Sequence, residues 1–540
     1  MGGIMDKTWQ TLARYLRIGL IAALATGSLA AGASAEVIYR RGNAGDPKTL
    51  DQHQTSIDVE ANILRDLYDG LLAYDSRGKV TPAAAASWTI SPDGKVYTFK
   101  LRENGKWSNG DPVKASDFVF SFRRMLDPQT AARYAALHYP IKNARAVNRG
   151  ELPPAELGVK AIDDSTLEIT LEQPTPYFLE LLTHQTALPL HQASVEKFGK
   201  DFVRAGNLVS NGAFQLTEFV PSDHIKVVKN PNYFDAKDVK VDTVIFYPTE
   251  DSAAAVRRFM AGELDTNYQF PIDQLTFLKE KLGGQVRTAP YLSIEYYATN
   301  FQKAPFNDPR VRHALSLAID RDFLAEKTWG GAAVPAYRLT PPGLQNYTPP
   351  EIAGAGETQL DREDKAKELL KEAGYGPGLK PLKVEIRYNT NDSNKNTATA
   401  VADMWKSALG AEVTLLNSDI KSHYAYLQNK GDFDIARAGW VGDYADPQNF
   451  LFLGLSDNAV SNYSRYKNPD YDALLKKTDE TGDQAQRMKM LSDAEAMIMK
   501  DEPIIPLIYR SSLHLVSPKV TGYEDNVQNV HRSRYISIAP

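Results

Sequence analysis

The clearest strand-like patterns lie in the first third of the chain. Polar and apolar residues alternate with period two over Thr166–Leu171, directly after a turn signal at Asp163-Asp164. Val96–Leu101 is rich in β-branched and aromatic residues, a composition that favours strands. We therefore predict two antiparallel strands in this part of the chain.

Apolar residues recur at helical spacing in the second half. Over Pro309–Phe323, Val311, Leu315 and Ala318 fall on one face, and the first residue, a proline, suits the first turn of a helix. Asp361–Ala373 has charged residues on its outer positions and is followed by glycine. Both segments are predicted to be helices.

A strand–helix–strand alternation between residues 383 and 440 indicates a βαβ unit. The predicted segments are strands at Lys383–Tyr388, Ala411–Leu416 and Gly431–Trp440 and a helix at Thr397–Leu409, with Ala400, Met404 and Ala408 on one face. Together with the earlier segments, this alternation predicts an α/β fold. Ligands of open α/β sheets bind beyond the carboxyl ends of the strands, so the segment 440–447 is well placed for binding.

The first 35 residues have the features of a secretory signal peptide. Lys7, Arg14 and Arg17 precede an apolar run at 18–31, and Ala33–Ala35 supplies the small residues that a signal peptidase needs. The run of about fourteen residues is too short for a membrane span of roughly 20. We expect cleavage before Glu36 and a mature protein free in the bacterial periplasm, without direct membrane insertion.

Amino-acid composition and net charge further restrict the chemistry and the partners that this protein can have. The chain has no cysteine, which excludes disulfides, thiolate nucleophiles and thiolate metal sites. Its net charge is −5, and removal of residues 1–35, which carry three cations and Asp6, changes this to −7. An acidic balance argues against a nucleic-acid partner and against adhesion to an anionic membrane. About 505 mature residues imply more than one folding unit.

No motif commits the protein to catalysis. The nine histidines are scattered without the spacing of metal ligands, and no nucleophile elbow, P-loop or dinucleotide-binding fingerprint occurs. Pairs of aspartates lie in turn contexts, where local backbone capping accounts for them. We expect no enzymatic activity, no catalytic residue, no metal site and no cofactor.

A candidate binding segment lies at Arg437–Pro447. It places a cation (Arg437), a large aromatic ring (Trp440) and an anion (Asp443) within seven residues, among glycines that allow a ligand to approach closely. The same spacing suits a structural role, in which Arg437 and Asp443 form an ion pair and Trp440 is a core or lid aromatic. The spacing alone indicates a polar site at a strand-to-loop junction.

Further motifs follow one another along the chain in a recognisable order. They are Arg65–Leu72, Val96–Pro112, Ala115–Val119, Gly158–Ala161, Pro174–Leu182, Val195–Gly199, Asn211–Phe214, Gln302–Asp308 and Arg310–Arg312. With the segment Arg437–Pro447, they resemble the periplasmic oligopeptide-binding proteins of ABC importers, the family 5 extracellular solute-binding proteins. The resemblance rests on this shared order over some 500 residues.

The resemblance implies a two-lobed periplasmic-binding-protein fold with a hinge and an additional inserted domain. Domain I, the ligand lobe on the hinge side, would comprise residues 36–68, 193–292 and 511–540. Domain II, the inserted domain, would comprise residues 69–192, and domain III, the second ligand lobe, residues 293–510. The lobes would enclose the ligand as the hinge closes.

The resemblance also implies roles for individual residues. Asp443 takes the place of the acid that pairs with the free α-ammonium group of a peptide, and Arg437 that of a base that complements a ligand carboxylate or orients the loop. The main chain of Gly439, Trp440 and Val441, and of Ser56, Ile57 and Asp58, would hydrogen-bond the peptide as an added strand. Pocket-lining positions correspond to Trp440, Tyr134, Tyr268, Tyr291 and Tyr509.

Three features depart from the family pattern. Asn394 stands where close peptide binders have a histidine, and Gln428 stands where they have an arginine; both family residues help to hold carboxylate ends of ligands. Val441 and Ser293 stand where some members have a bridged pair of cysteines. Recognition of the ligand's length and C-terminus is therefore open, and loop rigidity must come from packing.

The implied function is capture of short peptides by a monomer that delivers them to the membrane permease of an ABC importer. A narrower ligand, such as a murein peptide or a dipeptide, is an alternative within the class. A rival from another class is a periplasmic chaperone that uses the same cleft. A chaperone would bind internal, N-blocked segments, whereas the Asp443 mechanism requires a free amine.

Overall fold

The computed structural model describes residues 35–55, 57–458 and 460–539. Its helices and strands all lie in one compact unit, Ile38–Pro540. The signal peptide predicted for residues 1–35 lies outside the described residues except for its last position.

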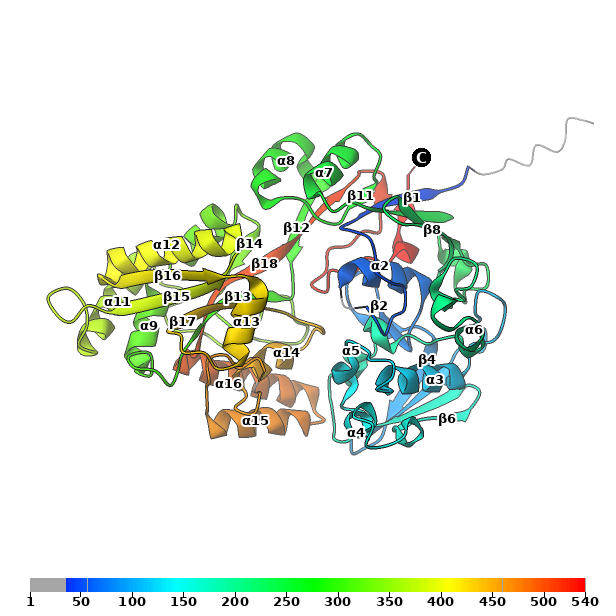
Figure 1. Cartoon of the computed structure of the whole chain (residues 1–540), viewed down its shortest axis with the longest axis horizontal. Helices are drawn as coiled ribbons and strands as arrows, with labels where there is room; N and C mark the ends of the chain where they lie inside the picture. Colours follow the sequence, from blue (N-terminus) through cyan, green and yellow to red (C-terminus); the bar gives the residue numbers. More distant parts are fainter. Residues whose placement is uncertain (1–34, 56, 459, 540) are drawn as a thin grey trace, which may run out of the picture. The chain divides into compact units, whose positions relative to one another are not determined.

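A mixed sheet of twelve strands forms the largest element (Figure 1). Its strands are β1 (Ile38–Asn43), β8 (Phe214–Val220), β9 (His224–Lys229), β10 (Thr243–Pro248), β11 (Thr266–Asn267), β12 (Val286–Pro290), β13 (Ser293–Thr299), β14 (Ala333–Pro335), β15 (Lys383–Asn389), β16 (Glu412–Ser418), β17 (Ile435–Val441) and β18 (Ile504–Val516). The order is β16-β15-β17-β13-β18-β11-β1-β10-β9-β8, and β12 and β14 also pair with β18. The 13-residue strand β18 therefore connects the two halves of this sheet.

A separate antiparallel sheet has the order β4-β5-β7-β6. Its strands are β4 (Ala85–Ile90), β5 (Val96–Leu101), β6 (Val159–Asp163) and β7 (Thr166–Thr170). The two strands predicted here are confirmed, and they pair with each other in antiparallel register. Two short ladders complete the strands: β2 (Leu72–Tyr74) with β3 (Val80–Pro82), and β19 (Val520–Thr521) with β20 (Ser537–Ile538).

Helices connect and cover these sheets. They are α2 (Asp58–Leu67), α3 (Ala115–Leu126), α4 (Ala144–Asn148), α5 (Phe178–Leu181), α6 (Gln192–Phe198), α7 (Ser252–Met260), α8 (Leu275–Leu282), α9 (Pro309–Leu317), α10 (Arg321–Phe323), α11 (Gln359–Glu372), α12 (Asp392–Leu409), α13 (Ile420–Gln428), α14 (Gln448–Leu451), α15 (Pro469–Asp479) and α16 (Gln484–Asp501). None of the helices in the described part of the chain is long and apolar enough to cross a membrane.

Two helix boundaries differ from the prediction because of capping side chains. The helix expected over Pro309–Phe323 is wrong in length: α9 ends at Leu317, and Asp320 caps the separate α10 by accepting a hydrogen bond from the Phe323 backbone N–H at 2.9 Å. Helix α12 begins five residues before the predicted start because Asn391 caps it, accepting from the Ser393 N–H at 2.9 Å. Side-chain acceptors at such positions begin helices by satisfying free N–H groups.

The buried face of α12 also differs from the expected one. Val401 and Trp405 are fully buried, and the Trp405 indole N–H donates to the Leu315 carbonyl of α9 at 2.8 Å. This large ring, which must find a hydrogen-bond partner when buried, orients the helix. The residues of the expected face are only half-buried: Ala400, Met404 and Ala408.

The βαβ unit is confirmed, with one additional helix. β15 pairs in parallel with both β16 and β17. The sequence pattern missed α13, which lies between β16 and β17, and β17 begins at Ile435 rather than at Gly431. Gly431 follows α13 in a turn where a Cβ would lie 2.4 Å from the Tyr426 ring, so a glycine is required there.

Two hydrophobic cores cover opposite faces of β13 and β17, and β15 contributes to the first of them. Residues of α9, α11 and α12 pack on one face, and residues of α13, α14, α15 and α16 pack on the other. In Figure 1, α12 lies above β15 and β16, whereas α15 and α16 lie below them. The first half of β17 is thus buried between the two cores, through Ile435 on one face and Ala436 and Ala438 on the other.

Candidate functional site

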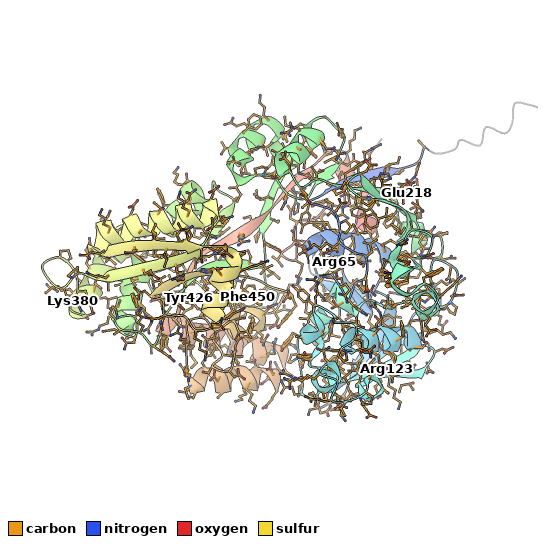
Figure 2. All side chains as sticks on the ribbon, in the orientation of Figure 1. Arg65, Arg123, Glu218, Lys380, Tyr426 and Phe450 are labelled. Carbon is orange, nitrogen blue, oxygen red and sulfur yellow. The ribbon has the colours of Figure 1, made fainter. Side chains whose placement is uncertain are left out.

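β17 carries the predicted binding segment, and two glycines shape it. β17 pairs with β13 along its whole length, and Gly439 lies directly opposite Glu295. A Cβ at Gly439 would lie 3.0 Å from both the Arg437 guanidinium and the Glu295 carboxylate. A Cβ at Gly442 would lie 3.0 Å from the ring of buried Phe450, which Figure 2 labels. The glycines therefore allow charged groups and a core ring to approach the strand closely.

One edge of β17 lacks a strand partner near its carboxyl end. The pairing with β15 covers only Ile435 and Ala436, although β17 continues to Val441. Main-chain groups of Gly439–Val441 that point toward this side are not used by a neighbouring strand among the described residues. An open edge of this kind is a template for an added strand.

A cavity of about 620 Å³ lies beside this edge. The predicted site residues that line it are Asp58, Tyr268, Tyr291, Asn394, Arg437, Gly439, Trp440 and Val441. They come from α2, β17, α12 and the segments around β11 and β13. The structure thus brings together residues that are almost 400 positions apart in the chain.

Asp443 follows β17 in the loop and is half-buried. No arginine, lysine or histidine in the described part of the chain forms an ion pair with it, so the expected alternative of an Arg437–Asp443 pair is wrong. Burial, and then the negative charge of Asp58, raise the pKa of Asp443 to about 6. An acid with a raised pKa and no cation is suited to receive a positively charged group.

Three tyrosines interact with these two acids, one by a hydrogen bond and all three electrostatically. The Tyr268 hydroxyl donates to the Asp58 carboxylate at 3.0 Å. Burial first, and then the charges of Asp443 and Asp58, raise the pKa of Tyr134. The pKa of Tyr291 is raised by burial and then by Asp58. The acids and the tyrosines therefore share one electrostatic environment, although Tyr134 and Asp443 do not line the cavity itself.

Arg437 is engaged by other residues of the protein. Its guanidinium donates to Glu295 through Nε at 2.9 Å and through Nη2, to the Asn389 side-chain oxygen at 3.0 Å and to the Tyr424 hydroxyl at 3.2 Å. Asn394 donates to the same Asn389 oxygen at 3.1 Å. Asn394 and Arg437 therefore belong to one hydrogen-bond network.

Glu295 and Arg510 are site residues that sequence reasoning missed. Arg510 lines the cavity and forms an ion pair with Glu295, which also binds Arg437. A signal existed for Glu295, because it is a single charge in the otherwise apolar and hydroxylated strand β13. Arg510 carries a comparable signal, because it is the single arginine, lysine, aspartate or glutamate in the largely apolar strand β18.

Trp440 has both a packing role and a cavity-lining role. Its indole N–H donates to the Asn449 side chain at 3.0 Å, and its ring packs edge-on against Phe452 at 5.0 Å between centroids. The ring is half-buried and lines the cavity. The adjacent Val441 is exposed and lies opposite buried Ser293 in register.

Some predicted residues lie elsewhere. Tyr509 is buried in the core, where its hydroxyl donates to the Arg338 carbonyl at 2.8 Å, and it does not line the cavity. Ile57 is exposed at the start of α2 and does not line the cavity either. Ser56 lies outside the described residues.

Comparison with known proteins places this site in a family. The model for bacterial extracellular solute-binding proteins, family 5 Middle, matches residues 79–462. The periplasmic oligopeptide-binding protein OppA of Salmonella typhimurium is 41% identical over 496 residues, which cover 91% of each chain.

Solved structures agree with this match. The unliganded open form of the murein tripeptide-binding protein MppA superposes with a TM-score of 0.87 at 37% identity, covering 94% of this chain and 98% of MppA. Haemophilus influenzae OppA in complex with RPPGFSPFR superposes with a TM-score of 0.73 at 37% identity, covering 94% of this chain and 100% of that chain. These matches confirm the predicted α/β periplasmic-binding-protein fold. Because the family model spans most of the chain and the Salmonella relative aligns almost throughout, this protein belongs to the family 5 bacterial extracellular solute-binding proteins.

Proposed function

We propose that this protein is a periplasmic receptor that captures short peptides and delivers them to the membrane permease of an ABC importer. The Haemophilus relative was solved with a nonapeptide, and the Salmonella relative is named for oligopeptide binding. Both support peptides as the ligand class.

One arrangement carries the proposal: Asp443, a half-buried acid that forms no ion pair among the described residues, lies just beyond the open edge of β17. A peptide that adds to this edge through its main chain would present its N-terminal ammonium group to Asp443. Main-chain hydrogen bonding does not depend on side-chain identity, so many sequences can be accepted. The acid sets the register, because a peptide without a free amine leaves it unpaired.

The neighbouring residues take supporting roles. The main chains of Gly439–Val441 and of Ile57 and Asp58 would flank the peptide on two sides. Trp440, Tyr134, Tyr268 and Tyr291 form walls for its side chains, with waters filling the remaining space. Asn394 acts through the network that holds Asn389 and Arg437 in place.

Titration calorimetry tests this function. The mature protein, refolded from denaturant to remove carried-over ligand, is titrated with peptides of two to six residues and with their N-acetylated forms. We expect binding of the free peptides and a loss of at least tenfold in affinity on acetylation, since a buried charge then lacks its partner. Equal binding of both forms would reject the amine site and favour a chaperone-like role. Binding of neither would reject peptides as ligands.

Other properties belong to the same proposal. We expect a monomer without catalytic activity or a cofactor, whose signal peptide is cleaved before Glu36. The mass of the exported protein checks the cleavage site, and its mass in solution checks the monomer. Incubation with peptide followed by product analysis should return intact peptide. A narrower ligand, such as a murein peptide or a dipeptide, would be evident as a single preferred length or composition in the titrations.

A further inference from the structure

Arg437, the cation that family resemblance assigns to a ligand carboxylate, already uses four of its five N–H groups within the protein. All three of its guanidinium nitrogens donate to Glu295, Asn389 or Tyr424. Its side chain is only 9% exposed. Arg437 therefore offers a ligand carboxylate at most one N–H, on Nη2, unless it releases one of these partners.

Arg510, in the long strand β18, is in the opposite situation. Its side chain is 38% exposed and lines the cavity. It forms one ion pair, through Nη2 with Glu295, and its buried Nε meets no hydrogen-bond acceptor among the described residues. A guanidinium can make five donor contacts in a fork that matches a carboxylate.

The charges around Glu295 do not balance. Two guanidinium groups, those of Arg437 and Arg510, share the single Glu295 carboxylate, whose side chain is 4% exposed. One positive charge is left over. Both guanidinium groups line the cavity, and that of Arg510 is the more exposed of the two. The negative charges of Asp58 and Asp443 are in the same electrostatic environment, since Tyr291 is influenced by both acids and by Arg510.

We propose that Arg510, positioned by Glu295, is a carboxylate-binding residue of the ligand site and makes the receptor favour peptides that place a carboxylate there. The inference rests on the proposed peptide-binding function and deepens it. The carboxylate comes either from the C-terminus of a short peptide or from an acidic side chain, which present the same chemistry to the guanidinium. Arg437 then acts as a positioning residue that holds Glu295 and does not contact the ligand.

Paired peptides separate the two sources. One arm compares tripeptides of alanine with a glutamate or a glutamine at position 1, 2 or 3. The other arm compares trialanine with its C-terminal amide. We expect at least one arm to show a preference of about tenfold or more for the carboxylate form, the effect of one charge-assisted hydrogen bond.

Arg510→Met should abolish that preference, so that the carboxylate and neutral forms bind about equally. Arg510→Lys, which retains the charge but loses the planar fork, should keep part of it. The matched control is Arg123→Met, which removes a half-buried guanidinium on α3 outside the cavity, labelled in Figure 2. Its preference should equal that of the unaltered protein. Thermal melting of each variant checks that the fold is intact.

The outcomes are distinguishable. If Arg510→Met binds all peptides with the carboxylate preference unchanged, or if the unaltered protein shows no preference, the role of Arg510 is rejected while peptide capture stands. If neither the free peptides nor their amides bind the unaltered protein, both proposals fall together. If Arg510→Met does not fold, the result for Arg510→Lys decides, because an unchanged preference in that variant also rejects recognition by the guanidinium fork.

Discussion

At the scale of single residues, the protonation of Asp443 links ligand binding to pH. Burial, followed by the charge of Asp58, raises its pKa from an ordinary value of 3.8 to about 6. Pairing with an ammonium group requires the ionised form, whereas the unliganded site favours the protonated form below pH 6. Affinity should therefore fall as the pH falls through the folded-state pKa.

We expect peptide affinity to weaken about tenfold between pH 7 and pH 5, because about nine in ten sites are protonated at pH 5 when the pKa is about 6. Calorimetry with one unblocked peptide across this range measures the effect. The pH dependence of folding stability in the unliganded protein has the opposite sign. Because the pKa of Asp443 is raised on folding, this group contributes stability below the unfolded pKa of 3.8, and that stability is lost as the pH rises through 6. A pH-independent affinity would contradict the assignment.

Replacing the acid itself gives a second prediction. Asp443→Asn should weaken peptide binding at pH 7 by tenfold or more and should flatten its pH dependence, since the bound ammonium loses its counter-charge. The melting temperature of the unliganded variant at pH 7 should not fall, because Asp443 has no ion pair in the described structure and its raised pKa costs stability at that pH. Asp457→Asn, at an exposed position of the same part of the chain, is the control and should bind as the unaltered protein does.

At the scale of elements, tertiary packing and capping set helix faces and helix boundaries that differ from those predicted by local sequence patterns. The pattern of α12 predicted a small-residue face, but the bulky Trp405 is what enters the core against α9. Capping by Asp320 and Asn391 moved helix boundaries that apolar spacing alone could not locate. The strands were predicted more closely, since their β-branched and alternating composition is local. The division into three domains stays a prediction.

Trp405→Ala should destabilise this part of the protein by about 3–5 kcal/mol, the cost of emptying a fully buried aromatic site, because Trp405 is 0% exposed. The Leu315 carbonyl would also lose its donor. The shift of the urea unfolding midpoint measures this effect. Lys406→Ala, at the next and exposed position of the same helix, should leave the midpoint nearly unchanged. A similar midpoint for both variants would show that α12 is not anchored by its tryptophan.

At the scale of the whole molecule, buried ion pairs join distant parts of the chain. Asp69, just after α2, is 1% exposed and pairs with Arg532 near the C-terminus. The Tyr233 hydroxyl also donates to it, at 2.8 Å. Tyr233 and Arg532 are 164 and 463 residues away from Asp69 in the sequence. Both therefore bring distant segments of the chain to the Asp69 carboxylate.

Arg532→Met should lower the free energy of unfolding by about 3 kcal/mol, at the low end for a broken buried pair, because Arg534 at 4.0 Å still compensates part of the Asp69 charge. Denaturant unfolding monitored by circular dichroism measures it. Adding Asp69→Asn to this variant should recover part of the loss, since the uncompensated charge is then removed. No recovery would indicate that the arginine stabilises by packing alone.

The sequence by itself determined the class of fold, the family and the position of Trp440 and Asp443 at the carboxyl end of a strand. Composition, hydrophobic periodicity and the order of motifs can all be read directly along the chain. The tertiary structure decided which charges meet. Arg437 pairs with Glu295, 142 residues away, and Glu295 with Arg510, 215 residues away. Such pairs depend on the register of β17 and β18 beside β13, which sets which side chains share a face. Strand register across the sheet is a property of the whole fold, and no local pattern encodes it.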